Sequence, residues 1–427
     1  MSEEKEKSAP RMGEVVELRQ RPPLPRRKKF WMNDMEAVFG IMLLLLIFGT
    51  VNVLSSSFVL AETEYGSETF FLRRHLISLA VGGVFFLFAA WVDYHKWRRL
   101  MPLVVITMFV CLFGVLLFGE EVKGARRWIH LPFMQFQPAE GAKVVAIMLA
   151  AAFLSVLARR GRPIAGLRGL LKLIRNPQTA LIVGMAILVE REPDMGTACF
   201  IIGVPLVLYI IGSRMKLSWI IGLMGIVAAG AAAAVLSQPY RMERVRMLWD
   251  PWQDATDKGY QAVQSLSTVG SGGLTGMGLG IGVSKYNYLP EAHTDFAFAI
   301  FAQENGFIFV FFAIVLYALL AFYGTRIARR AGDYFGTFLA FGVVLLVTMQ
   351  AALNMLMVGG MFPVVGVPLP FISYGGSALI FTMFAMGLLV NVGRLADREN
   401  RRREQREEER EQHPVKKVRH IGLRRVK

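Results

Sequence analysis

A carboxylate and a basic cluster are the residues of this sequence most suited to chemistry. Asp295 stands directly before a long apolar stretch, while Lys123, Arg126 and Arg127 lie close together in a short polar segment. An aspartate ahead of an apolar helix is most often an N-terminal cap, but such a carboxylate also serves as a general base that takes a proton from a hydroxyl. Lysine and arginine side chains bind phosphate groups. Together the two features suit a reaction in which a hydroxyl attacks and a phosphate leaves.

Two further pairs of polar residues are spaced three apart, so that both members share one face of a helix. Glu140 and Lys143 stand at the start of an apolar run, where they either line a cavity or form an ion pair with each other. Arg241 and Arg244 precede a tryptophan-containing segment, where they either hold lipid phosphates or anchor an interfacial helix. The basic cluster has a comparable second interpretation, in which it pairs with the two adjacent glutamates or with lipid phosphate.

The composition places the chain in a lipid bilayer. Of its 427 residues, 54% are hydrophobic and only 19% are charged. The mean hydropathy is +0.44, and a soluble domain of this length is far more polar. The net charge of +16 comes from lysines and arginines in tails and short loops, which argues against a nucleic-acid surface. Both cysteines, Cys111 and Cys199, lie inside apolar runs, so we expect neither a disulfide framework nor a metal-ligand cluster.

Ten apolar segments are candidates for helices that cross the bilayer, which takes about 20 residues each. They are residues 37–60, 72–92, 101–118, 141–158, 178–190, 196–212, 217–236, 296–323, 334–358 and 372–392. The predicted fold class is therefore an all-α polytopic membrane protein with about ten transmembrane helices. Along the chain we expect a largely disordered basic tail over 1–35, a membrane domain over 36–394 and a charged tail over 395–427. The first apolar segment is too long for a signal-peptide core, so it is expected to be an anchor.

The positions of the cations predict the orientation. Roughly three quarters of the 48 Lys and Arg residues fall in the two tails and in alternate loops, and such residues gather on the cytoplasmic side. Both termini are therefore expected in the cytoplasm, which agrees with an even number of helices. Residues 62–68, 120–128 and 237–295 are then extracytoplasmic.

The extracytoplasmic segment 237–295, between the seventh and eighth predicted helices, is much longer than an ordinary connection. It carries Trp249, Trp252 and several tyrosines, together with the glycine-rich run 270–282. Aromatic side chains at this density pack or lie at the membrane interface, and glycines let the backbone approach a ligand closely. We therefore expect this loop to be folded and functional.

Six stretches resemble the motifs of one known family. They are Lys123-Gly-Ala-Arg-Arg-Trp128, Gln137-Pro-Ala-Glu140, Glu192-Pro-Asp-Met-Gly-Thr197, Asp250-Pro-Trp252 with Gly259-Tyr-Gln261, Tyr288-Leu-Pro-Glu-Ala-His-Thr-Asp-Phe296 and Pro368-Leu-Pro-Phe-Ile-Ser-Tyr-Gly-Gly376. In this order they resemble the SEDS family, whose members include FtsW, RodA and SpoVE, and the resemblance covers about residues 35–395. One departure is Gln303-Glu-Asn305, which stands where the family usually has Glu-Glu-Leu.

The resemblance implies a peptidoglycan glycosyltransferase that polymerises lipid II, a disaccharide peptide on undecaprenyl pyrophosphate, into glycan strands. It implies that Asp295, the aspartate of the His-Thr-Asp-Phe motif, is the catalytic general base. Substrate-binding roles are expected for Lys123, Arg127, Glu140, Lys143, Arg241, Arg244, Glu291, His293 and Ser373. Asp194 is expected to cap a helix.

Partners and location follow from the same resemblance. The expected partners are lipid II, a class B penicillin-binding protein with transpeptidase activity, other division proteins and membrane lipids, in the cytoplasmic (inner) membrane of a bacterium at the division septum. Neither nucleic acid nor a covalent cofactor is expected. A divalent cation such as Mg²⁺ fits pyrophosphate chemistry but is not indicated by the sequence.

Two other functions remain open from the residues alone. A lipid II flippase would place ionisable groups near the middle of its helices, where Glu304 is the main example here. A scaffold that binds division proteins through its tails would leave Asp295 and the basic cluster without a role. Within the family, Asp250-Pro-Trp252 and the long N-terminal tail are typical of the division type, FtsW, whereas residues 363–370 are closer to the elongation type, RodA. We expect the division type.

Overall fold

The computed structural model describes residues 33–122, 124–131, 134–160, 172–212, 217–286 and 288–412. Lys123, a member of the predicted basic cluster, lies outside these ranges. The chain divides into two units, Met1–Asn33 and Asp34–Lys427, and all the elements below belong to the second unit.

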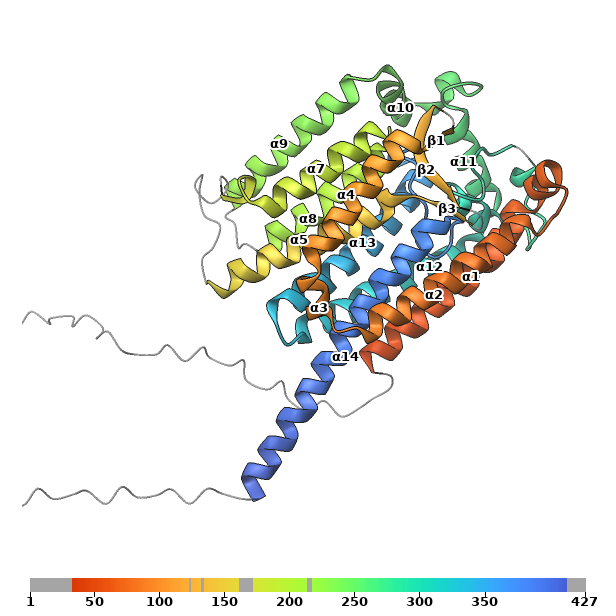
Figure 1. Ribbon diagram of the computed structural model, residues 1–427. Coiled ribbons are helices and arrows are strands. Elements are labelled where there is room, and N and C mark those ends of the chain that lie inside the picture. Colours follow the sequence, from red (N-terminus) through yellow and green to blue (C-terminus); the bar gives the residue numbers. More distant parts are fainter. Residues whose placement is uncertain are drawn as a thin grey trace, which may run out of the picture. The chain divides into compact units, whose positions relative to one another are not determined.

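Helices make up most of the described structure, and each of the ten predicted apolar segments coincides with one of them (Figure 1). The α-helices are α1 Asp34–Tyr65, α2 Phe70–Trp91, α3 Tyr94–Arg99, α4 Met101–Phe118, α5 Pro138–Arg159, α7 Pro177–Arg191, α8 Met195–Gly212, α9 Leu217–Leu236, α10 Pro239–Trp249, α11 Tyr260–Ser271, α12 Ala297–Arg330, α13 Tyr334–Val358 and α14 Gly376–Gln412. Two short 3₁₀ helices, η1 Pro251–Asp254 and η2 Val283–Lys285, flank α11.

Eight of these helices are long and apolar enough to cross a membrane: α1, α2, α4, α5, α8, α12, α13 and α14. The predicted all-α polytopic membrane fold is therefore confirmed. Of the two remaining predicted spans, α7 has only 15 residues, and α9 contributes the shorter apolar stretch Ser218–Gly230. The total of ten spans stays a prediction.

A small antiparallel sheet between α4 and α5 was not expected from the sequence. Its strands are β1 Glu120–Val122, β2 Ala125–Leu131 and β3 Met134–Phe136, in the order β1-β2-β3. Val122 pairs with Ala125, so the first turn has two residues, and one of them, Gly124, has a φ of +76°. A two-residue hairpin turn requires such positive φ values, which glycine adopts without strain. The sheet thereby fixes the backbone of Arg126 and Arg127, two members of the predicted basic cluster.

Small residues let α5 and α13 pack closely in the middle of the helices. Ala146 and Ala150 of α5 are completely buried. A Cβ atom placed on Gly342 of α13 would lie only 2.4 Å from Ile147 of α5, so glycine is required at that crossing. Between membrane helices, contact of this kind supplies the packing energy, since lipid tails are as apolar as the side chains. Residues at the start of α5 are consequently held inside the protein.

Helix α12 is broken, although the sequence pattern predicts one continuous span. Gly306 has a φ of +74°, outside the helical region. Four backbone hydrogen bonds join the broken ends to the loop after α11: Met277 N to Gln303 O at 3.0 Å, Gly278 N to Glu304 O at 3.0 Å, Phe307 N to Gly273 O at 2.9 Å and Ile308 N to Leu274 O at 3.2 Å. Backbone groups within a membrane protein need internal partners, and the glycine-rich loop supplies them here. The first part of α12, residues 297–305, is therefore held by this loop as well as by the rest of its own helix.

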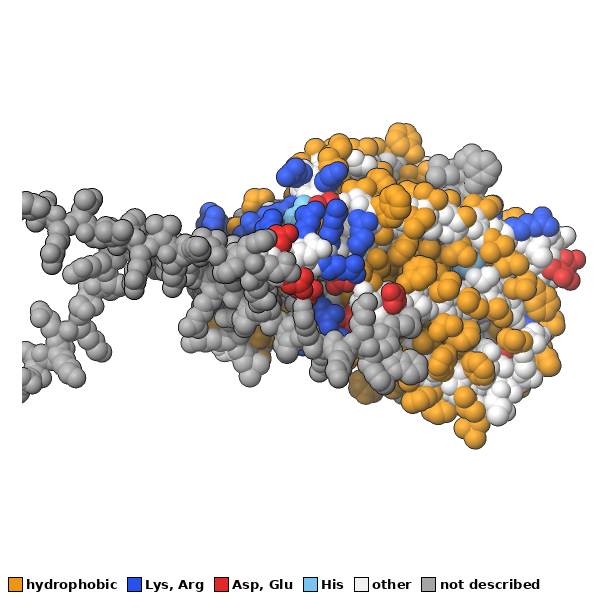
Figure 2. Space-filling model, turned by 90° about the horizontal axis from the view of Figure 1, so that it is seen from below, with side chains coloured by type: hydrophobic (Ala, Val, Ile, Leu, Met, Phe, Trp, Pro, Cys, Tyr) orange, Lys and Arg blue, Asp and Glu red, His pale blue; other side chains and the backbone are white. Residues whose placement is uncertain are grey.

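The two ends of this unit differ in charge. At one end, which we call the basic end, Arg330 and Arg326 of α12 bind Asp34 of α1 at 2.7 and 3.2 Å. Figure 2 shows Lys and Arg side chains gathered in one region, next to an extensive hydrophobic surface. The opposite end, where β1–β3, α10 and α11 lie, is called the motif end below (Figure 1).

Candidate active site

The six sequence motifs meet at the motif end, where each makes at least one hydrogen bond to another. The bonds are Arg127 Nε to Glu192 O at 3.1 Å, Gln137 Nε2 to Asp194 Oδ2 at 2.9 Å, Tyr374 N to His293 O at 2.9 Å and the Tyr260 hydroxyl to Tyr288 O at 2.7 Å. These bonds join the motifs into two groups of three, and the groups meet at Asp295, whose ionisation responds to the charges of Asp194 and Arg127.

Asp295 lies at the entrance to α12, but its side chain is not the helix cap. Phe296 occupies the N-cap position, and the helix has no side-chain cap hydrogen bond. The Asp295 carboxylate instead faces the loop between α13 and α14, since a Cβ atom placed on Gly366 would lie 3.3 Å from its Oδ2. The structural interpretation that position alone favoured is therefore wrong, and the carboxylate is available for another role.

The surroundings of Asp295 raise its pKa to about 7. The main cause is withdrawal from solvent, and the negative charges of Glu291 and Asp194 add to it. The positive charges of Arg127 and Arg244 act in the opposite direction. A general base is most effective when its pKa lies near the working pH, and this carboxylate meets that condition.

Hydrogen bonds hold the side chains of Glu291 and Asp194 in place. Glu291 has a φ of +54°, which is strained for a residue with a side chain, and its Oε2 accepts a hydrogen bond of 2.8 Å from Thr294. Asp194 accepts a hydrogen bond of 3.1 Å from Thr197 N at the start of α8, so it caps that helix as expected. Both carboxylates are fixed close enough to Asp295 to influence its ionisation.

The two arginines of β2 have different surroundings. Arg127 is partly buried, donates through Nε to Glu192 O and donates through Nη2 to Pro193 O. Arg126 is exposed and pairs with Glu121 at 3.4 Å. Arg126 therefore follows the structural interpretation of the basic cluster, whereas the Arg127 guanidinium is oriented at the site and has five N–H donors in total.

The two arginines of α10 are anchored to different elements. Arg241 is buried and binds Glu190 of α7 at 2.6 Å. Arg244 donates to Val364 O at 2.8 Å, in the same loop that contacts Asp295. The positive charge of Arg244 lowers the pKa of Asp295, so Arg244 is an α10 cation placed at the candidate base.

Glu140 and Lys143 form the mutual ion pair that their spacing allowed. The Lys143 Nζ lies 2.8 Å from Glu140 Oε2, and both side chains are buried. Lys143 also donates to Gln350 Oε1 at 2.9 Å, and Gln350 Nε2 donates to Pro368 O at 3.0 Å. These residues connect α5, α13 and the following loop inside the protein.

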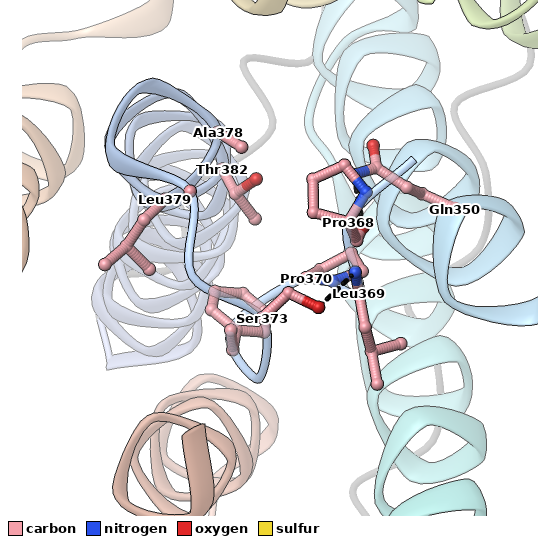
Figure 3. Close-up of a pocket in the computed structure, with 10 residues that line it drawn as sticks. Gln350, Pro368, Leu369, Pro370, Ser373, Ala378, Leu379 and Thr382 are labelled. Atoms are coloured by element: carbon pink, nitrogen blue, oxygen red, sulfur yellow. Dashed lines mark hydrogen bonds between the residues drawn. The ribbon is translucent and has the colours of Figure 1, made fainter. Parts of the chain in front are cut away.

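Ser373 and His293 are likewise engaged in local structure. The Ser373 hydroxyl accepts a hydrogen bond of 2.9 Å from Leu369 N within the turn before α14 (Figure 3). The cavity beside it has a volume of about 10 Å³, which is room for a single water molecule. The His293 ring packs 4.7 Å from the Phe71 ring and 5.6 Å from the Tyr374 ring. Both residues help to hold the motif segments 288–296 and 368–376 in place.

Several functional candidates were missed because they are single polar residues in apolar or turn segments. Glu192 is fully buried, and neither of its carboxyl oxygens has a hydrogen-bond partner among the described residues. Asn354 of α13 donates to Asp295 O at 2.8 Å. A polar residue inside a membrane helix is a functional signal in its own right, and Gln350 and Asn354 carried that signal in the sequence. The described residues contain no group of three or more His, Cys, Asp or Glu side chains that could hold a metal ion.

Curated relatives match this chain over most of their length. Stage V sporulation protein E of Bacillus subtilis (strain 168) is 37% identical over 358 residues, which cover 83% of this chain and 95% of the relative. The probable peptidoglycan glycosyltransferase FtsW of Geobacter sp. (strain M18) is 40% identical over 362 residues, again 83% of this chain and 95% of the relative.

Solved structures share the fold. One, described as "Structural coordination of polymerization and crosslinking by a peptidoglycan synthase complex", matches with a TM-score of 0.69 and 26% identity over 85% of this chain and 98% of the other. The rod shape determining protein RodA of Thermus thermophilus matches with a TM-score of 0.60 and 24% identity, over 84% of this chain and 95% of the other. The family profile described as "Cell cycle protein" matches residues 35–398. The chain is a multi-pass membrane protein that belongs to the FtsW, RodA and SpoVE family.

Proposed function

We propose that this protein polymerises lipid II into β-1,4 glycan strands, with Asp295 as the general base. Relatives named as peptidoglycan glycosyltransferases support the reaction class. The residue assignment rests on the state of the Asp295 carboxylate, which does not cap α12. Its pKa is raised to about 7, although two arginines close to it act to lower the pKa.

The proposed reaction is a single displacement with inversion. Asp295 takes the proton from the acceptor sugar hydroxyl as that oxygen attacks the anomeric carbon of the donor. The bond from that carbon to the pyrophosphate oxygen breaks, and the undecaprenyl pyrophosphate leaves with the electron pair. Arg127 and Arg244 stabilise the charge that develops on this leaving group, with Arg241 as a further cation of the same region. Lys123 is proposed for the same role from its sequence motif alone. A divalent cation such as Mg²⁺ enters this proposal only as a companion of the pyrophosphate.

The proposed orientation places the motif end outside the cytoplasm and the basic end inside. The ion pairs of Arg326 and Arg330 at the basic end agree with the excess of Lys and Arg in the tails and alternate loops. Both termini would then be cytoplasmic. Lipid II that has already been moved across the membrane would meet Asp295 with its headgroup outside. The division septum is the proposed location, as expected for the division type.

The proposed partner is a class B penicillin-binding protein that crosslinks the new strands. A structural relative is described as part of a peptidoglycan synthase complex that coordinates polymerization and crosslinking. Other division proteins are proposed to bind through the tails, whose charge-rich composition suits interaction segments.

The proposal is tested by polymerisation of lipid II with purified protein, with and without a cognate class B penicillin-binding protein, and with glycan length read on a gel. Wild type should make strands, and Asp295→Asn should make none. Asp257→Asn is the matched control, since Asp257 lies exposed in the same extracytoplasmic segment. Full activity of Asp295→Asn would remove the base assignment. A wild type that makes no strands but moves lipid II across vesicle membranes would favour the flippase.

A further inference from the structure

Two buried asparagines hold the backbone on which Asp295 stands. Asn52 of α1 donates through Nδ2 to Ala297 O at 3.1 Å. Asn354 of α13 donates through Nδ2 to Asp295 O at 2.8 Å and to Val367 O at 2.7 Å. The two residues are 3% and 0% exposed. The entrance of α12 is thus bound from two sides, by helices that are far apart in the sequence.

Packing alone does not account for these amides. The Oδ1 atoms of Asn52 and Asn354 are both buried without a hydrogen-bond partner among the described residues. A buried polar atom without a partner costs free energy, whereas a leucine of similar size would leave no such atom. The hydrogen bond that Asn52 donates adds little stability to offset this cost. Its acceptor, Ala297 O, lies in the first turn of α12, where the backbone N–H four residues later is already placed to bond to it.

The entrance of α12 needs external support because the helix is broken further on. The break at Gly306 separates residues 297–305 from the remainder of α12. The rest of the helix therefore fixes these residues less firmly than an unbroken helix would. Asn354 also binds Val367 O, one residue from Gly366, whose backbone approaches the Asp295 carboxylate. One amide thus sets the distance between Asp295 and the loop that faces it.

We propose that Asn52 and Asn354 form an amide clamp, a pair of positioning residues that place the Asp295 carboxylate for proton transfer. This proposal rests on the proposed role of Asp295 as the base. A reacting group displaced by about 1 Å loses up to about a hundredfold in rate. Release of either amide lets the entrance of α12 shift, and Asp295 shifts with it.

The test compares Asn52→Leu, Asn354→Leu and the control Asn391→Leu in the full-length protein. Asn391 is equally buried and makes two hydrogen bonds, to Ala90 O at 2.6 Å and from Tyr94 N at 3.0 Å, away from the motif end. We expect kcat for lipid II polymerisation to fall about 10- to 100-fold in both clamp variants, with KM changed less than about threefold. The control should keep its kcat within about twofold even where its melting temperature falls.

Two further measurements separate positioning from stability. Asn52→Leu should keep or raise the melting temperature, because it removes the buried Oδ1 atom that has no hydrogen-bond partner among the described residues. Its kcat should fall all the same. The acid limb of the pH–rate profile should move to lower pH in both clamp variants, because a displaced Asp295 is more exposed to solvent and its pKa falls.

Two results would decide against parts of this inference. If Asp295→Asn is inactive but both clamp variants keep wild-type kcat and an unchanged acid limb, the clamp is wrong and the base assignment stands. If Asp295→Asn is fully active, the base assignment fails and the clamp fails with it.

Discussion

Lys285 Nζ lies 2.6 Å from Glu304 Oε1, and the two side chains are 0% and 1% exposed. Ser55 of α1 completes the group, since its hydroxyl donates to Glu304 Oε2 at 2.5 Å and lies 3.2 Å from Lys285 Nζ. The pair fastens η2, at the end of the long loop, to α1 and α12. Glu304 was the main residue of the sequence that favoured a transporter. The Glu304 carboxylate is buried and its charge is neutralised by Lys285. It therefore holds the loop in place and is not available to bind a transported substrate.

Removal of one partner from this pair should be strongly destabilising. Glu304→Gln leaves a buried, uncompensated lysine, which costs about 3–5 kcal/mol of unfolding free energy. The double variant Lys285→Met with Glu304→Gln should lose much less than the sum of the single losses, as measured by unfolding in detergent. Glu243→Gln is the control, because Glu243 binds Lys258 at the same 2.6 Å but on the exposed surface, where such a pair contributes little. Additive losses in the double variant would contradict this account.

The rate of polymerisation should rise with pH through about 7, because Asp295 acts as a base only when it is ionised and its pKa is raised to about 7. Initial rates across this range in wild type give the acid limb directly. Arg244→Gln should move the limb to higher pH, since the Arg244 charge lowers this pKa. A limb that stays at the same pH in Arg244→Gln would show that this arginine does not act on the base.

The same raised pKa predicts an effect of opposite sign on stability. The folded state favours the protonated carboxyl, so ionisation of Asp295 weakens the fold increasingly as pH rises from its ordinary pKa of 3.8 to about 7. Asp295→Asn should therefore raise the melting temperature at about pH 8 and change it little at about pH 4. An equal change at both pH values would mean that the carboxyl is not perturbed by its site.

The membrane helices can be predicted from the sequence, because a segment that crosses the bilayer must be apolar whatever it packs against. The six motifs can be recognised because each is a continuous stretch of residues. The break at Gly306 could not be predicted in this way. The backbone groups that lose their helical partners there form hydrogen bonds with the loop 273–278, and a local sequence pattern does not reveal a contact with a distant loop. The ion pair of Glu140 and Lys143 was readable as one of two alternatives, and only the packing of α5 decided between them. Asn52 and Asn354 were unreadable as positioning residues, since their partners are backbone carbonyls.

Gly306 should tolerate no side chain. A Cβ atom at this position would lie 2.2 Å from Gly276 N, and its φ of +74° is strained for any other residue. Gly306→Ala should therefore lower the free energy of unfolding by more than about 2 kcal/mol, and it should abolish polymerisation by displacing the loop. Gly225→Ala in α9 is the control, because a Cβ atom there meets nothing within 4 Å. Equal melting temperatures for the two variants would refute the role assigned to the break.

Arg127 and its neighbour Arg126 allow a matched test of the phosphate site. Arg127→Ala should lower kcat/KM for lipid II about 10- to 100-fold, and Arg127→Lys should restore only part of this, because lysine lacks the planar fork that binds two phosphate oxygens. Arg126→Ala should stay within about twofold of wild type, since that side chain is exposed and paired with Glu121. Steady-state rates at several lipid II concentrations separate the two cases. Equal losses in both alanine variants would point to the sheet rather than to the Arg127 guanidinium.

Glu192 should set the alkaline limb of the same pH–rate profile. Its carboxyl is fully buried, and burial together with the charge of Asp194 raises its pKa to about 8 although Arg127 acts in the opposite direction. It is therefore neutral at pH 7, and ionisation above about 8 adds a negative charge beside Arg127, where it competes with pyrophosphate for that cation. Wild-type kcat/KM should fall above about pH 8, whereas Glu192→Gln, which stays neutral, should keep its neutral-pH rate at high pH. An alkaline limb that survives unchanged in Glu192→Gln would assign it to another group, with Lys123, the lysine of the Arg127 motif, as the next residue to replace.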